Sequence, residues 1–172
     1  MTLERAFEAV GSFMETGGSV LTVIFAVTLL MWTLILERLW FMRLSHPRQA
    51  KQVMADWAKR EDHTSWYARA TRRKLIAELA DAMNHSLPMI KTLVALCPLL
   101  GLLGTVTGMI EVFQVMAVAG NGNPRAMASG VSMATIPTMA GMVAAISGLY
   151  MSAQLHKFAQ DETRRVSDAM TT

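Results

Sequence analysis

Residues 92–110 read TLVALCPLLGLLGTVTGMI and contain no Asp, Glu, Lys or Arg. Two further uncharged stretches, residues 16–36 and 126–155, lie on either side of this segment along the chain. A helix needs about 20 mainly apolar residues to cross the hydrocarbon layer of a membrane, so each stretch is long enough to span it. The sequence therefore predicts an all-α integral membrane protein with three transmembrane helices.

The composition of the whole chain agrees with this prediction. Of the 172 residues, 52% are hydrophobic and 17% are charged, whereas a typical soluble domain has about 25% charged residues. The first apolar stretch exceeds the core of a signal peptide, which has about 7–15 residues, and acidic residues precede it. We therefore expect it to be retained as a membrane helix. The single cysteine, Cys97, excludes an intramolecular disulfide and a cysteine-based zinc site.

Basic residues predict the orientation of the chain in the membrane. Fourteen of the 16 lysines and arginines lie in residues 37–91 or in the C-terminal tail. The positive-inside rule places these segments in the cytoplasm, so the N-terminus and the turn after residue 119 face the periplasm. Because acidic residues alternate with the basic ones, the formal charge of +3 reflects topology, and we expect no nucleic-acid partner.

These observations divide the chain into seven predicted segments. In order they are a periplasmic N-terminus (1–17), transmembrane helix 1 (18–43), a cytoplasmic helical region (44–87), transmembrane helix 2 (88–119), a periplasmic turn (120–125), transmembrane helix 3 (126–155) and a cytoplasmic tail (156–172).

The cytoplasmic segments are predicted to form a small helical bundle. We expect a break at residues 45–47, with Pro47 in the first turn of a new helix. From Trp66 a helical pattern resumes, and we expect it to continue into the second span with a bend near Pro88. The third span is likewise expected to extend past the membrane. The apolar face of the helix after Trp66 consists of Leu75, Ile76, Leu79 and Met83.

The second and third spans are rich in small residues, unlike the first. Small side chains let helix backbones approach closely in lipid, where apolar burial alone does not drive association. The predicted packing positions are Gly101, Gly104, Gly108, Gly141 and Ala145.

Two threonines in these spans are the candidate pore-lining residues. Thr105 lies 17 residues before Gly122 in the turn, and Thr138 lies 16 residues after it. At about 1.5 Å per residue, both hydroxyls lie about 25 Å from the turn, at nearly the same depth. A threonine in a membrane helix often bonds to its own backbone carbonyl, which is the alternative interpretation. The matched depth favours a narrow polar path, because hydroxyls can relay protons without a charge at mid-bilayer.

Glu111 is the one acidic residue within the predicted second and third spans, and it lies near the outer end of the second. We interpret it as a candidate pore-mouth residue, with proton entry as the alternative role. The four histidines show no metal-ligand spacing, and no HExxH, GxSxG or P-loop motif is present. The sequence therefore predicts no enzyme, no cofactor and no metal site.

Residues 98–110 (PLLGLLGTVTGMI) and 130–146 (GVSMATIPTMAGMVAAI) resemble the MotA/TolQ/ExbB proton-channel family. The first segment matches the pattern P-x-x-G-L-x-G-T-V-x-G-M, and the second matches T-x-x-G-x-x-A-A/V-I. The shared region runs from about residue 88 to residue 155. The three-span layout and the short cytoplasmic loop are similar to a compact ExbB of an accessory TonB system.

This resemblance implies a homopentamer around a pair of single-span ExbD-like chains, whose aspartate carries the proton. It carries the pore-lining role to Thr105 and Thr138. Relatives often have a glutamate five residues before the second pore threonine, and this chain has Met133 there. Either this branch of the family functions without that glutamate, or the aspartate of the partner suffices.

The implied function is the channel subunit of a proton-driven motor in the bacterial inner membrane. With an ExbD-like partner and a TonB-like transducer, it would energise outer-membrane import. Membrane lipid is a further expected partner. The basic cytoplasmic bundle is a candidate surface for anionic lipid or a partner segment, although a solvated helix face is the favoured interpretation of its basic residues. The alternatives are a TolQ-like subunit for envelope integrity and a non-conducting membrane scaffold, whereas a MotA-like flagellar stator would need a fourth span.

Overall fold

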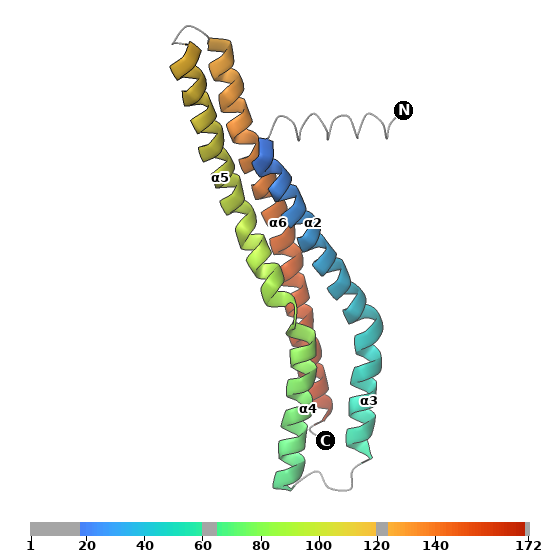
Figure 1. The fold of residues 1–172 in the computed structure, drawn as a ribbon. Coiled ribbons are helices and arrows are strands. Elements are labelled where there is room, and N and C mark those ends of the chain that lie inside the picture. Colours follow the sequence, from blue (N-terminus) through green and yellow to red (C-terminus); the bar gives the residue numbers. More distant parts are fainter. Residues whose placement is uncertain (1–17, 60–64, 120–123, 171–172) are drawn as a thin grey trace, which may run out of the picture. The chain divides into compact units, whose positions relative to one another are not determined.

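The computed structural model describes residues 18–59, 65–119 and 124–170. Its helices are α2 (Gly18–Trp40), the π-helical turn η1 (Phe41–Ser45), α3 (His46–Ala58), α4 (Trp66–Asn84), α5 (Leu87–Ala119) and α6 (Pro124–Ala169) (Figure 1). The described residues contain no strand. Three of their helical stretches are long and apolar enough to cross a membrane, Gly18–Leu44, Trp66–Ala117 and Ala128–Ala169. The prediction of an all-α membrane protein is confirmed.

The described chain divides into two compact units. The first contains residues 18–31 of α2, 92–119 of α5 and 124–149 of α6. Small residues bring these helices together: Cys97, Ala144 and Ala145 form a buried cluster against which Val27 of α2 packs. This unit is a three-helix assembly in which each helix contributes one of the uncharged stretches.

The second unit contains residues 32–59, 65–91 and 150–170. Its core joins Trp57 of α3, Leu79 of α4 and Val166 of α6, all of which are buried. The predicted apolar face of α4 is found here, because Leu75 and Ile76 pack against the same cluster. The segments 44–87 and 156–172 therefore contribute to a small helical bundle, as the sequence predicts.

The expected break at residues 45–47 is wrong, because the helix stays continuous through η1 into α3. Pro47 lies in the first turn of α3, where a proline fits well. Its missing N–H cannot donate to the carbonyl of Arg43, and the wider π-helical turn accommodates this interruption of the hydrogen-bond ladder.

The chain continues from α4 into the second span with an interruption just before Pro88, close to the expected bend. Helix α4 ends at Asn84 and α5 begins at Leu87, and in the two-residue turn between them His85 keeps right-handed helical dihedral angles (φ −47°, ψ −47°). Pro88 explains the interruption, because it has no N–H to donate to the Asn84 carbonyl and its ring would clash with that oxygen. At the other end of α4, the Ser65 hydroxyl caps the helix by accepting a hydrogen bond from the Ala68 amide at 3.1 Å.

The turn predicted at residues 120–125 ends two residues earlier than expected. Helix α6 begins at Pro124, the position at which proline is favoured in a helix. Residues 120–123 and the predicted N-terminal segment 1–17 lie outside the described residues.

Candidate functional site

Helices α5 and α6 approach each other at backbone distance in the first unit. A Cβ atom added at Gly108 would lie 2.6 Å from the Cβ atom of Ala134, and one added at Gly141 would lie 2.5 Å from the carbonyl oxygen of Cys97. A Cβ atom at Gly104 would collide with a proline ring of α6. The glycines that the sequence singles out therefore lie where the two backbones meet.

Thr138 links these two helices through its side chain. Its hydroxyl donates a hydrogen bond to the carbonyl oxygen of Gly101 at 2.9 Å. The contact requires a close approach, since a Cβ atom at Gly101 would lie 3.0 Å from the Cα atom of Thr138. Thr138 thus departs from the common pattern in which a membrane threonine bonds to its own helix.

Thr105 follows that common pattern. Its hydroxyl donates to the carbonyl oxygen of Leu102 in its own helix at 2.7 Å, and its side chain is partly exposed. A hydroxyl that donates one hydrogen bond still has lone pairs to accept others. The Thr105 oxygen can therefore still accept a hydrogen bond from water or from another chain.

The two threonines match in depth only to within about one helical turn. Thr138 lies beside Gly101, which is four residues from Thr105 along α5, or about 6 Å. The residue count from the turn predicts a smaller difference in depth between the two threonines. The difference arises because the glycine contacts, and not the length of the turn, determine how α6 is aligned along α5.

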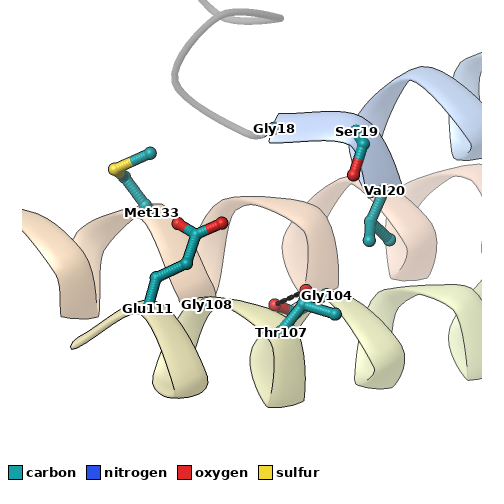
Figure 2. Close-up of a pocket in the computed structure, with 8 residues that line it drawn as sticks. All are labelled: Gly18, Ser19, Val20, Gly104, Thr107, Gly108, Glu111 and Met133. Carbon is teal, nitrogen blue, oxygen red and sulfur yellow. Dashed lines mark hydrogen bonds between the residues drawn. The ribbon is translucent and has the colours of Figure 1, made fainter. Parts of the chain in front are cut away.

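Glu111 lines a cavity of about 40 Å³ between the three helices of the first unit. Figure 2 shows the side chains of Glu111 from α5 and Met133 from α6 at one end of this cavity, and Ser19 of α2 at the other. The remaining lining residues are Gly18, Val20, Gly104, Thr107 and Gly108. The position at which the resemblance implies a glutamate thus opens onto the same cavity as Glu111.

The sequence interpretation missed one residue, Arg38, which it counted only as a basic residue of the cytoplasmic side. Its side chain is 6% exposed, and its guanidinium donates to the Ala82 carbonyl at 3.1 Å and to the Ser86 hydroxyl at 2.6 Å. It also lies 3.3 Å from Nδ1 of His85 and 5.4 Å from the centre of the Phe41 ring. A cation within an apolar helix was the available signal, because such a residue needs buried partners.

No group of three His, Cys, Asp or Glu side chains within the described ranges is arranged to hold a metal ion. The polar side chains described in the first unit are instead hydroxyls, the Gln114 amide, the Cys97 thiol and one carboxyl group. This arrangement can hold water and exchange protons with it, and each threonine oxygen can both donate and accept.

The chain is similar in sequence to known proteins that are named for biopolymer transport. The chain is 47% identical to the biopolymer transport protein ExbB-like 1 of Synechocystis sp. over 70 residues. The matched region covers 39% of this chain and 28% of that protein. Over 89 residues it is 36% identical to the biopolymer transport protein exbB1 of Vibrio cholerae, which covers 51% of this chain and 39% of that protein. An ExbB homologue of Methanothermobacter thermautotrophicus is 38% identical over 77 residues, 45% of this chain and 26% of that protein.

The matches therefore cover between 26% and 39% of the length of these relatives. A broader match exists at the level of the family, since residues 42–168 match the MotA/TolQ/ExbB proton channel family. These residues make up well over half of the chain and include all of α5 and nearly all of α6. The resemblance seen in the sequence is confirmed, and the chain belongs to the MotA/TolQ/ExbB proton channel family.

Proposed function

We propose that this chain is the channel subunit of a motor in the bacterial inner membrane that is driven by the proton-motive force. It works with an ExbD-like single-span partner and a TonB-like transducer to energise outer-membrane import. Membership of a proton channel family, whose members are transport proteins and not enzymes, supports the class of this function. The names of the relatives, which describe biopolymer transport, support the role in import.

The observation that carries the proposal is the α5–α6 pair with its two hydroxyls. Thr105 and Thr138 lie within about one helical turn of each other, on two helices that meet at glycine contacts. Three helices of one chain are too few to enclose a pore, so several copies must surround the path, and the family resemblance suggests five. Each proton that crosses a potential of 100 mV releases roughly 2.3 kcal/mol, and several protons therefore suffice for a substantial rearrangement of the partner.

The test compares three valine substitutions in cells that depend on this system for outer-membrane uptake. Thr105→Val and Thr138→Val remove a hydroxyl at nearly constant volume, and each is expected to abolish uptake. Thr138→Ser keeps the hydroxyl and is expected to keep uptake. The matched control is Thr28→Val in α2, whose hydroxyl donates to the Ile24 carbonyl of its own helix at 2.7 Å. Uptake that survives Thr105→Val and Thr138→Val, with normal amounts of protein in the membrane, would refute the pore assignment.

A non-conducting scaffold is the second candidate, because the Thr105 hydroxyl is bonded within its own helix. A scaffold keeps its partners together but passes no protons. Proton flux into liposomes that contain the chain and its co-purified partner separates the two functions. The channel predicts a flux that Thr105→Val reduces, whereas the scaffold predicts no flux with either protein.

A further inference from the structure

The cavity between α2, α5 and α6 contains one group that can exchange a proton with water. Among the residues of the first unit whose side chains are described, Glu111 is the one carboxylic acid, and no lysine or arginine is among them. Serine and threonine hydroxyls relay protons, whereas a carboxyl group can also store one. The chemistry of the cavity therefore depends on Glu111.

We propose that Glu111 takes up and releases a proton in this cavity, and so supplies from α5 a proton-storing step of the channel. This inference rests on the proposed proton-channel function. The cavity has a volume of about 40 Å³, and one water molecule needs about 10–15 Å³ on the same measure, so there is room for water beside the carboxyl group.

The residues around Glu111 provide partners for this water and for the ionised carboxyl group. The Ser19 hydroxyl lines the cavity, as does Thr107, whose hydroxyl donates to the Gly104 carbonyl at 3.1 Å and retains lone pairs. Helix α2 begins here at Gly18, whose φ of +67° a glycine adopts without strain. The first-turn N–H groups of a helix have no partner within it and favour a negative charge nearby.

Two glycines of α5, Gly104 and Gly108, line the cavity. A Cβ atom at these positions would meet Pro137 or Ala134 of α6, so the glycines allow the two helices to approach closely beside the cavity. The cavity therefore lies beside the same helix contact that brings Thr138 to Gly101. Glu111 reaches it from α5 and Met133 reaches it from α6 (Figure 2).

This geometry predicts that a carboxyl group at residue 133 of α6 can replace the carboxyl group of Glu111 on α5. Glu111→Gln should lower transport by about a hundredfold, the size of effect typical for loss of a positioned proton donor or acceptor. Adding Met133→Glu to this variant should restore most of the transport, because residue 133 lines the same cavity. Adding Met133→Gln is the matched control, which supplies a polar group of the same shape without a carboxyl and should restore nothing. Glu111→Asp keeps the carboxyl group and should keep part of the transport.

A second measurement follows the carboxyl group itself. Infrared difference spectra of the chain in lipid nanodiscs, recorded between two pH values, should contain a C=O band from the Glu111 carboxyl group, whose side chain lines the cavity and is exposed in the single chain. Glu111→Gln should remove this band, and Glu111→Gln with Met133→Glu should return it. Glu78→Gln is the control and should leave this band in place, because Glu78 lies in α4, outside the cavity, and pairs with Lys74 at 3.6 Å.

The two measurements separate this inference from the proposed function. A pH-difference spectrum of Glu111→Gln equal to that of the wild type, together with unchanged transport, would overturn the assignment while leaving the threonine pathway intact. A wild-type complex that passes no protons would overturn the proposed function, and the infrared band would still decide whether Glu111 is the proton-storing group.

Discussion

Individual atoms determine how closely α5 and α6 pack. At Gly108 the space for a methyl group is already taken by Ala134, whose Cβ and Cα atoms would lie 2.6 and 2.7 Å from an added Cβ. At Gly101 the nearest atom would be 3.0 Å away. The contact is tighter at Gly108, so a methyl group there requires one of the two backbones to move.

These distances predict a graded effect of alanine substitutions on stability. Gly108→Ala should lower the free energy of unfolding by about 1–3 kcal/mol, the usual cost of forcing extra atoms into a well-packed contact. Gly101→Ala should cost less, because its neighbour needs to move by only a few tenths of an ångström. Unfolding by increasing fractions of SDS in mixed micelles measures both. Equal stability of Gly108→Ala and the wild type would mean that the helices are farther apart in the membrane.

Helix ends, at the scale of whole elements, are determined by prolines and by the side chains that bond to the freed backbone groups. Pro88 separates α4 from α5, and the last carbonyls of α4 are left without partners in their own helix. Arg38 from α2 donates to one of them, at Ala82, and to the Ser86 hydroxyl in the connection. The buried guanidinium thus joins the end of one helix to the junction between two others.

We expect Arg38→Ala to destabilise this junction. It leaves the Ala82 carbonyl and the Ser86 hydroxyl without their donor, which costs about 1–3 kcal/mol for a buried polar group. Amide hydrogen exchange in the last turn of α4 should become faster. Arg38→Lys should restore only part of the protection, because an ammonium group lacks the planar set of donors that reaches both acceptors.

Arg43→Ala is the control for this prediction, because Arg43 lies five residues further along the chain and is exposed. Its exchange pattern should equal that of the wild type. Protection that is lost equally in both variants would show that the positive charge matters there and the hydrogen bonds do not.

At the scale of the whole molecule, the family match includes parts of both units, since it runs from residue 42 to residue 168. The first unit contains the hydroxyls of Thr105 and Thr138 and the carboxyl group of Glu111. The second unit is a helical bundle with a core around Trp57. The distribution of basic residues predicts that this bundle lies in the cytoplasm.

The predicted orientation can be tested with the native cysteine in place. Cys97 is buried and should not react with a membrane-impermeant maleimide, so it contributes no background. Lys157→Cys, at an exposed position of α6, should be labelled only in inverted membrane vesicles. Asn123→Cys, in the predicted periplasmic turn, should be labelled only in intact spheroplasts. The reverse pattern would place the N-terminus in the cytoplasm.

Much of the fold could be predicted from the sequence, because the relevant signals are local. Three uncharged stretches predict three spans, and the helical spacing of Leu75 and Leu79 predicts the face of α4 that packs in the bundle. The differences occur at prolines: Pro47 tolerates a continuous helix through a π-helical turn, whereas at Pro88 the expected bend is a two-residue turn between α4 and α5. A proline removes one hydrogen bond in either case, and the surrounding contacts decide which outcome is stable.

The sequence by itself determined the class of the protein, its spans, its small-residue helices and the chemistry available to it, since these follow from apolar length, charge and residue type. Only the tertiary structure decided which groups meet. Thr138 bonds to Gly101, Glu111 shares a cavity with Met133 and Ser19, and Arg38 reaches the end of α4. The physical reason is that the alignment of two packed helices depends on how closely their backbones approach at a few positions. The pattern of residues along each helix does not by itself specify that alignment.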